Sequence, residues 1–114
     1  MEQNVSEKID YNTFLKIDLR TATVLEAEKV EGSDKLLKLK IDLGYEQRQL
    51  VAGIAHMYKP EEIIGKQIII VANLEPRKIR GVESNGMLLA VENSEGKIIL
   101  ITTSEKTENG LKVH

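Results

Sequence analysis

The residues best suited to chemistry are three cations within four positions, Arg77, Lys78 and Arg80. Guanidinium and ammonium groups clustered in this way bind phosphates through charge-assisted hydrogen bonds. Pro76 precedes the cluster and Gly81 follows it, so the backbone is restricted where it enters the cluster and free to turn where it leaves. The pattern predicts a rigid, positively charged loop between two strands. The alternative is a solvated hairpin whose cations only maintain solubility.

Residue sets typical of an active site, a metal site or a nucleotide-binding loop do not occur in the sequence. The chain has no cysteine, and neither His56 nor His114 has a partner at the spacing of a catalytic or metal-binding motif. Gly65-Lys66-Gln67 resembles the end of a phosphate-binding loop, but Pro60 stands where the first glycine belongs, and Gln67 replaces the required hydroxyl residue. The sequence therefore indicates a binding module, not an enzyme, with no metal and no cofactor.

Composition limits the protein to one domain with an uneven charge distribution. A chain of 114 residues, 41% of them hydrophobic, is sized for a single core. The net charge is −2, but residues 35–90 carry nine cations and six acids, whereas residues 1–34 carry four and eight. Positive charge is therefore concentrated in the middle of the chain. No stretch resembles a signal peptide or a membrane span, so we expect a cytoplasmic protein that does not contact membranes.

The periodicity of apolar residues predicts the elements that position the cations. Asp10 is suited to cap a short helix that places Tyr11, Phe14 and Leu15 on one face. A second short helix is expected to begin at Pro60 and to end at Gly65. Strands are expected over residues 17–30, 37–43, 47–52, 66–74, 87–91 and 97–101.

These elements predict an all-β fold, a small five-stranded antiparallel Greek-key barrel of the oligonucleotide/oligosaccharide-binding (OB) kind, over residues 10–114. A short helix precedes the barrel, another lies between its third and fourth strands, and residues 1–9 are expected to be a flexible terminus. Strand 17–30 has apolar residues on both faces, which predicts a long, twisted strand covered on different sides along its length. The outer face of the second strand carries Lys38 and Lys40, with Lys35 at its edge. Such barrels bind ligands on this face.

Four segments of the sequence resemble the tRNA-binding domain family. They are Phe14-Leu-Lys-Ile-Asp-Leu-Arg20, Val30-Glu-Gly-Ser-Asp-Lys-Leu-Leu-Lys-Leu39, Leu50-Val-Ala-Gly-Ile-Ala55 and Asn73-Leu-Glu-Pro-Arg-Lys-Ile-Arg-Gly-Val-Glu-Ser-Asn-Gly-Met87. That family comprises the C-terminal appendix of many bacterial methionyl-tRNA synthetases, stand-alone dimeric tRNA-binding proteins and CsaA-type export chaperones. The resemblance covers roughly residues 10–110. It implies an OB fold and recognition of tRNA through its folded outer corner.

The resemblance also implies which residues contact RNA. The matching positions are Asn73, Arg77, Lys78, Arg80, Ser84 and Met87, with Lys35 and Arg20 as further members. Alternative roles remain for some of them: Asn73 and Ser84 suit the backbone of a turn, Met87 suits the core, and Arg20 suits an ion pair with Asp18 or Glu26. Aromatic residues make up only 4% of the chain, so few are available to stack on bases. Recognition by shape and phosphate contacts is therefore expected.

A small barrel with one cationic loop binds weakly, and two copies on one RNA bind more tightly through effective concentration. Stand-alone members of the family are dimeric, so the resemblance implies a homodimer, with Tyr11, Phe14, Leu15 and the C-terminal strands as the expected interface; core packing of that helix face is the alternative. The expected partners are tRNA and an aminoacyl-tRNA synthetase of the methionyl type. The alternative function is a CsaA-type chaperone that binds unfolded peptides. Whether the chain is a separate protein or a domain of a longer synthetase stays open.

Overall fold

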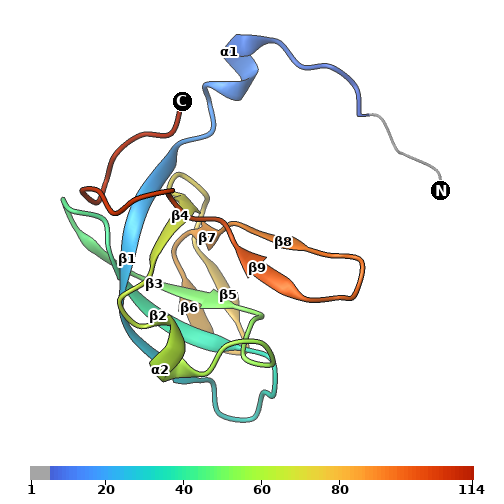
Figure 1. The fold of residues 1–114 in the computed structure, drawn as a ribbon, viewed down its shortest axis with the longest axis vertical. Coiled ribbons are helices and arrows are strands. Elements are labelled where there is room, and N and C mark those ends of the chain that lie inside the picture. The colour runs from blue at the N-terminus through green and yellow to red at the C-terminus, as the bar shows by residue number, and fades with distance from the viewer. Residues whose placement is uncertain (1–5) are drawn as a thin grey trace.

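The fold is a small antiparallel β-barrel, seen in a computed structural model that describes residues 6–114 (Figure 1). Its main sheet has five strands in the order β3-β2-β1-β4-β7. The strands are β1 (Leu19–Lys29), β2 (Leu37–Asp42), β3 (Gln47–Ala52), β4 (Gln67–Val71) and β7 (Met87–Leu88), and every pair is antiparallel. Residues 1–5 of the expected flexible terminus lie outside the described residues.

Strand β1 is the long strand around which the barrel curves. Its first half pairs with β4 and its second half with β2, and a β-bulge lies between Val24 and Glu26. The C-terminal tail covers the free edge of the first half, where the N–H of Thr21 donates to the carbonyl oxygen of Leu111 at 3.0 Å. The bulge changes which residues point inward, because it inserts an extra residue into one strand only. The prediction of a strand covered on different sides is confirmed.

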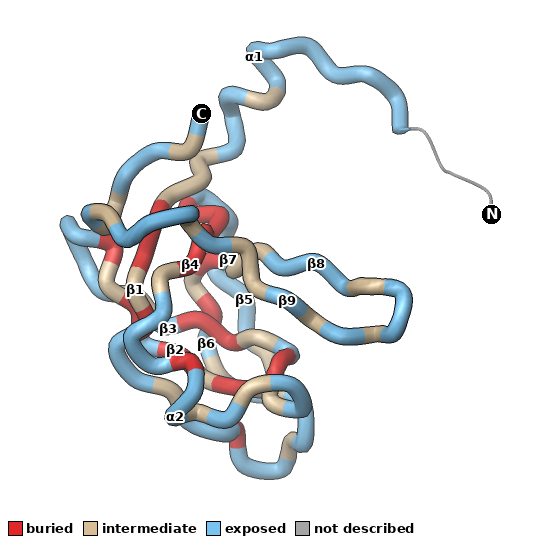
Figure 2. The backbone as a smooth tube through the Cα atoms, viewed as in Figure 1, coloured by how far each residue is buried: buried red, intermediate tan, exposed pale blue. Residues whose placement is uncertain are grey.

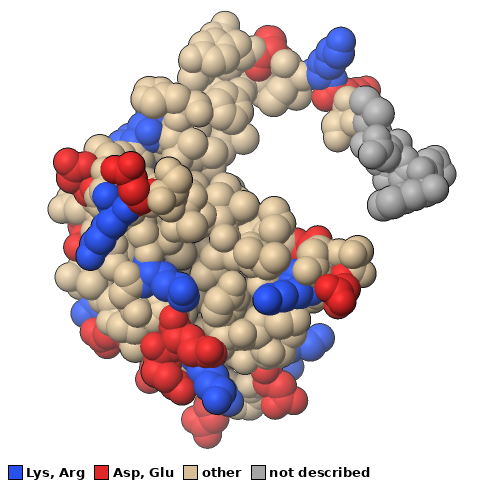
Figure 3. Space-filling view, viewed as in Figure 1, with Lys and Arg blue, Asp and Glu red and all other residues tan. Residues whose placement is uncertain are grey.

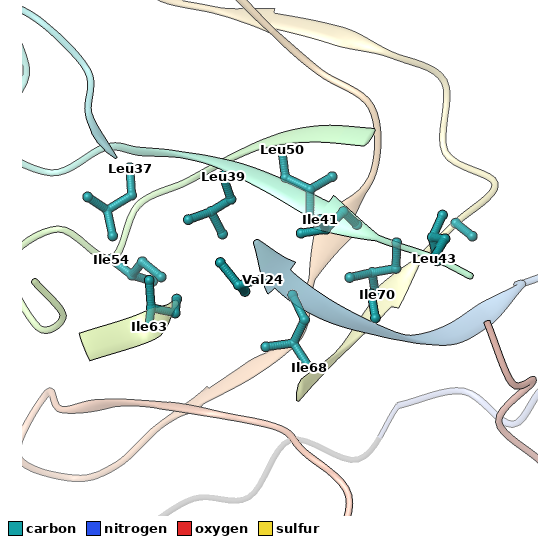
Figure 4. Close-up of a cluster of buried hydrophobic side chains, with 12 residues drawn as sticks. Val24, Leu37, Leu39, Ile41, Leu43, Leu50, Ile54, Ile63, Ile68 and Ile70 are labelled. Carbon is teal, nitrogen blue, oxygen red and sulfur yellow. The ribbon is translucent and has the colours of Figure 1, made fainter. Parts of the chain in front are cut away.

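The core lies inside the barrel (Figure 2). The alternation predicted for β2 is confirmed, because Leu37, Leu39, Ile41 and Leu43 are all fully buried while Lys40 is exposed. They pack with Val24 and with Ile68 and Ile70 of β4 (Figure 4). Helix α2 (Pro60–Ile63) adds Ile63 to this cluster, and Gly65, with a φ of 90°, ends the helix turn as predicted.

The expected charged loop is a β-hairpin, which closes the barrel. Strands β5 (Arg77–Ile79) and β6 (Val82–Ser84) pair with each other. The hairpin lies along β3, where the N–H of Asn85 donates to the carbonyl oxygen of Gln49 at 2.8 Å and the Gln49 amide donates to that of Glu83 at 2.8 Å. These bonds connect the segment that leads into β7, at one edge of the sheet, to β3, at the other edge. The five-stranded, nearly closed barrel confirms the predicted OB fold.

A second hairpin projects from the barrel. The apolar run predicted as one strand over 87–91 is divided at Leu89, so that β7 pairs with β4 and β8 (Ala90–Glu92) pairs with β9 (Ile98–Leu100). Leu89 lies between the two pairs. Its N–H donates to the carbonyl oxygen of Ile69 in β4, and its carbonyl oxygen accepts the N–H of Ile101, which follows β9, both at 3.0 Å. The β8–β9 hairpin extends away from the barrel in Figure 1. The single-strand prediction is corrected because the run leaves the barrel at this residue.

Helix α1 (Tyr11–Phe14) forms where predicted but stands away from the barrel (Figure 1). The Asp10 carboxylate caps the helix by accepting the N–H of Thr13 at 2.8 Å, and hydrogen bonds from the Thr13 side chain and backbone hold the pKa of Asp10 below its ordinary value. Tyr11 is 72% exposed and Leu15 42%. Phe14, the third residue of this face, is half-buried but does not belong to the hydrophobic core, so core packing of this face is wrong. No helix among the described residues is long and apolar enough to span a membrane.

Candidate nucleic-acid interface

The β5–β6 hairpin is shaped by a two-residue turn at Arg80 and Gly81. Both have positive φ, 53° and 77°, as a type I′ turn requires, because this turn matches the twist of the two strands that it joins. In residues 6–114, Arg80 is the one non-glycine residue with a positive φ. A side chain in this conformation is uncommon, and here it carries a cation to the tip of the hairpin.

The three cations of the hairpin have no acidic partner. Arg77, Lys78 and Arg80 are exposed, and no carboxylate of the described chain lies within ion-pair distance of any of them. Lys78 faces Glu83 across the strand pair, yet the two side chains do not form an ion pair. All three cations are therefore available to an anionic ligand.

Ser84 holds the hairpin in place from its inner side. It is 2% exposed, and its hydroxyl accepts the N–H of Val51 at 3.0 Å and donates to the carbonyl oxygen of Gly86 at 3.1 Å. The bond to Gly86 fits the alternative, a role in the backbone of the turn, whereas the bond to Val51 attaches the hairpin to β3. Gly86 has a φ of 129°, and a Cβ there would lie 3.0 Å from a Leu50 methyl group, so only glycine fits.

Asn73 lies at the root of the hairpin and contacts the segment that leads from α1 into β1. Its side-chain oxygen accepts the N–H of Asp18 at 2.8 Å, and its side-chain nitrogen donates to the carbonyl oxygen of Lys16 at 2.6 Å. Met87, in contrast, is 42% exposed, so the core alternative for it is wrong. Asn73 and Met87 line one open depression together with Leu74, Glu75, Pro76 and Arg77.

Lys38 and Lys40 lie on the face formed by β1 and β2 and are paired with acids. The Lys38 ammonium lies 2.6 Å from the Glu28 carboxylate, and that of Lys40 lies 3.5 Å from Glu26. Both pairs join residues directly opposite each other in β1 and β2. Gln49 of β3 lines the shallow depression beside these pairs and also donates to β6, so it lies between the two cationic surfaces. Lys35 is exposed in the turn before β2.

Arg20 takes the ion-pair alternative. Its Nε lies 2.8 Å from Oδ1 of Asp18, and its Nη1 donates to the carbonyl oxygen of Gly110 at 3.0 Å. Sequence reasoning missed Arg48, whose guanidinium pairs with Glu46 at 2.6 Å and also donates to the carbonyl oxygen of Ala72. The signal was the spacing of two between Arg48 and Glu46, which directly precedes β3, because side chains two apart in an extended chain point the same way.

The described part of the chain holds no group of three or more histidine, cysteine or acidic residues arranged to bind a metal ion. What the geometry offers is a rigid β-turn that carries three unpaired cations beside an exposed methionine. Such an arrangement can hold phosphates and a small apolar surface.

The same part of the chain matches a known family. Residues 19–112 match a family model described as "Putative tRNA binding domain". The chain belongs to this tRNA-binding domain family. The match covers the whole barrel and both hairpins, and the resemblance read from the sequence motifs is confirmed.

Relatives of this tRNA-binding domain include a methionine–tRNA ligase of Caldanaerobacter subterraneus subsp. tengcongensis, 56% identical over 115 residues; the match covers 98% of this chain and 18% of the ligase. The domain thus spans less than a fifth of that relative. Among solved structures it is similar to a MetRS-related protein from Pyrococcus horikoshii, with a TM-score of 0.90 and 42% identity, covering 96% of this chain and 100% of the other. It is also similar to the chaperone CsaA of Bacillus anthracis, with a TM-score of 0.85 and 31% identity, covering 95% and 100%.

Proposed function

We propose that this tRNA-binding domain is a non-catalytic module that binds folded tRNA by shape and phosphate contacts, as an accessory to aminoacylation of the methionyl type. The observation that carries the proposal is the set of unpaired cations Arg77, Lys78 and Arg80 on a rigid turn. Phosphate binding releases counterions from the RNA, which gives an affinity that falls steeply with salt. The relatives named methionine–tRNA ligase support tRNA as the ligand.

The other residues expected from the sequence have different roles in this proposal: direct contact, support of the hairpin, or a peripheral position. Met87 supplies an apolar contact beside the hairpin, because it is exposed and shares a depression with Arg77. Ser84 acts through the placement of the hairpin, since its hydroxyl is already used inside the barrel. Lys35, Lys38, Lys40 and Arg20 belong to the periphery, where all except Lys35 are engaged in ion pairs.

The proposal includes a homodimer. Exposed apolar side chains on α1, among them Tyr11 and Leu15, and on the β8–β9 hairpin, Val91 and Ile99, have no partner within the described chain. Figure 3 shows an open space between residues 6–15, which include α1, and the body of the molecule. A second copy that covers these groups would remove apolar area from water and would bring a second cationic hairpin to the same RNA. We place this dimer in the cytoplasm, with tRNA and the synthetase.

A chaperone function of the CsaA type is the second candidate. The specific observation in its favour is the similarity to CsaA structures, which matches nearly the whole chain. An apolar groove would carry that function, and peptide binding there would not need the three cations of the hairpin. The two candidates therefore respond differently to loss of these cations.

The test measures the affinity for bulk tRNA by fluorescence anisotropy, with an unstructured RNA of equal length as competitor and at several salt concentrations. The R77A/K78A/R80A variant is expected to lose on the order of 100-fold in affinity, and the slope of log affinity against log salt is expected to fall by about three. The matched control, K59A/K66A/K106A, removes the same charge from exposed lysines outside both hairpins and is expected to bind nearly as the wild type does.

The same variants are then tested for their ability to suppress the aggregation of an unfolded substrate protein. One outcome is that the wild type does not bind tRNA, and that the wild type and the R77A/K78A/R80A variant suppress aggregation equally well. The chaperone function then holds and the tRNA proposal is wrong. If the control variant loses as much tRNA affinity as the hairpin variant, the effect is one of total charge and the assignment to the hairpin fails.

A further inference from the structure

The root of the β5–β6 hairpin is fixed to two separate parts of the molecule, the segment before β1 and strand β3. The N–H of Ala72 donates to the carbonyl oxygen of Asp18 at 2.7 Å, and Arg48 of β3 donates to the carbonyl oxygen of Ala72. The next residue, Asn73, contacts the same segment through its side chain, which forms hydrogen bonds with the backbone of Lys16 and of Asp18. Two consecutive residues thus make four hydrogen bonds across the start of the hairpin.

The amide of Asn73 is held in one orientation. Its oxygen faces an N–H donor and its nitrogen faces a carbonyl acceptor, so a flipped amide would place donor against donor and acceptor against acceptor. Asp18 is fixed in turn, because its carboxylate pairs with Arg20, which also donates to Gly110 of the C-terminal tail. The side chain of Asn73 therefore belongs to a network that joins the N-terminal segment, the hairpin root and the tail.

The segment that Asn73 contacts is continuous with α1. The N–H of Lys16 donates to Thr13 at 3.2 Å and that of Ile17 donates to Phe14 at 3.0 Å, so the helical turn extends to the residues beside Asn73. Because no residue of α1 is buried against the barrel, its direction depends on this junction. In Figure 1 the helix is connected to the barrel only through the start of β1.

We propose that Asn73 is a positioning residue that sets the direction of α1 relative to the cationic β5–β6 hairpin, and that it does so instead of contacting RNA. This inference rests on the proposed function, in which α1 joins two copies and two hairpins bind one tRNA. In that dimer, the angle at the junction determines the separation of the two hairpins. Avidity falls when that separation no longer matches the RNA, even though each hairpin still binds.

The experiment compares two RNA probes, bulk tRNA and a stem-loop copy of one tRNA arm that is too short to reach both hairpins. The N73A variant is expected to bind the stem-loop within about twofold of the wild type and to bind tRNA roughly tenfold more weakly, because only the second binding event is lost. A residue that contacts RNA would weaken both probes by the same factor. Equal losses on both probes, or no loss on either, would overturn the proposal.

Two further measurements separate positioning from a general loss of structure. Sedimentation is expected to show the same dimer dissociation constant for N73A as for the wild type, and hydrogen exchange is expected to show lost protection at Asp18 and Ala72 only, with β2 and β3 unchanged. If N73A does not fold, D18A removes the pair with Arg20 at the other end of the same network, leaves the Asn73 amide in place and removes no cation, and it is expected to show the same selective loss on tRNA with a smaller size. A monomeric wild type that binds tRNA would overturn the proposal directly.

The outcomes also distinguish this inference from the proposed function. If the wild type binds neither RNA probe, the proposed function fails. If the wild type binds both, R77A/K78A/R80A loses both, and N73A behaves as the wild type does, the proposed function stands and only the positioning role is wrong.

Discussion

Two surfaces of this barrel carry lysines opposite glutamates, and only one of them leaves its cations unpaired. On the β1–β2 face, Lys38 and Lys40 lie 2.6 and 3.5 Å from Glu28 and Glu26. On the β5–β6 hairpin, Lys78 lies opposite Glu83 without forming an ion pair, and Arg77 and Arg80 have no carboxylate opposite them. A count of cations along the sequence therefore does not give the charge that a ligand meets.

The pairing on the β1–β2 face follows from the bulge in β1. Val24 lies opposite Ile41, and after the bulge Glu26 lies opposite Lys40 and Glu28 opposite Lys38. A regular strand would instead have placed Leu25 and Ala27 opposite these lysines, because one residue of register exchanges the two faces of a strand. One inserted residue thus decides that the lysines on this face are neutralised.

The largest effect is expected from the same charge reversal made on each surface. K78E is expected to lower the affinity for tRNA roughly 30-fold, about 2 kcal/mol, because it replaces an unpaired cation by an anion that faces Glu83 and repels phosphate. K38E is expected to change that affinity by less than about threefold, and instead to lower the free energy of unfolding by about 0.5 kcal/mol, since it places two glutamates directly opposite each other. Anisotropy and urea unfolding measure the two effects, and equal losses of affinity would remove the distinction between the surfaces.

The contrast between the surfaces shows what the sequence was able to predict. The barrel and both short helices were predicted because alternation and caps are local patterns. A positively charged turn was also predicted here, because Pro76 and Gly81 flank the three cations. The pairing of Lys38 and Lys40 was not, because it depends on a bulge that no local pattern marks.

The structural roles of Ser84 and Asn73 could not be predicted from the sequence for a different reason. Ser84 is buried only because the hairpin closes the barrel against Val51, which is 33 positions away. Asn73 contacts Lys16, which is 57 positions away. Hydrogen bonds between such distant residues follow from the packed fold, and sequence alone left these two residues with a choice between contact with RNA and service to a turn.

A smaller effect is expected from equal backbone strain placed on each surface. Gly81 in the hairpin turn and Gly32 between β1 and β2 have φ values of 77° and 82°, and a Cβ at either would meet no atom within 4 Å. G81A and G32A therefore each introduce about 1 kcal/mol of strain. G81A is expected to lower the affinity for tRNA by up to about fivefold because the turn positions Arg80. G32A is expected to leave the affinity unchanged in the same anisotropy assay, and a loss equal to that of G81A would contradict the assignment of RNA binding to the hairpin.

Removing the acids on the β1–β2 face is expected to produce a gain. E26Q/E28Q leaves Lys38 and Lys40 without their carboxylate partners, so this face acquires two unpaired cations. The affinity for unstructured RNA is expected to rise about threefold, with a steeper dependence on salt, because exposed ion pairs contribute little and are readily replaced by phosphate contacts. Adding K38A/K40A to the same chain is the control, and it is expected to abolish the gain. A gain that persists without the lysines would indicate a general effect of net charge.

The smallest effect is expected at the one acid of the hairpin itself. Glu83 is exposed and lies opposite Lys78, and its backbone carbonyl, not its carboxylate, accepts the hydrogen bond from Gln49. E83Q therefore keeps the attachment of the hairpin to β3 and removes only a negative charge near the phosphates. The affinity for tRNA is expected to rise by less than about twofold, because solvent and salt screen an exposed charge that forms no ion pair. E95Q, in the turn between β8 and β9, is the matched control. If E83Q raised the affinity for RNA as much as E26Q/E28Q does, Glu83 would mask Lys78 as effectively as Glu26 and Glu28 mask their lysines. The two surfaces would then differ only in the number of cations that they carry.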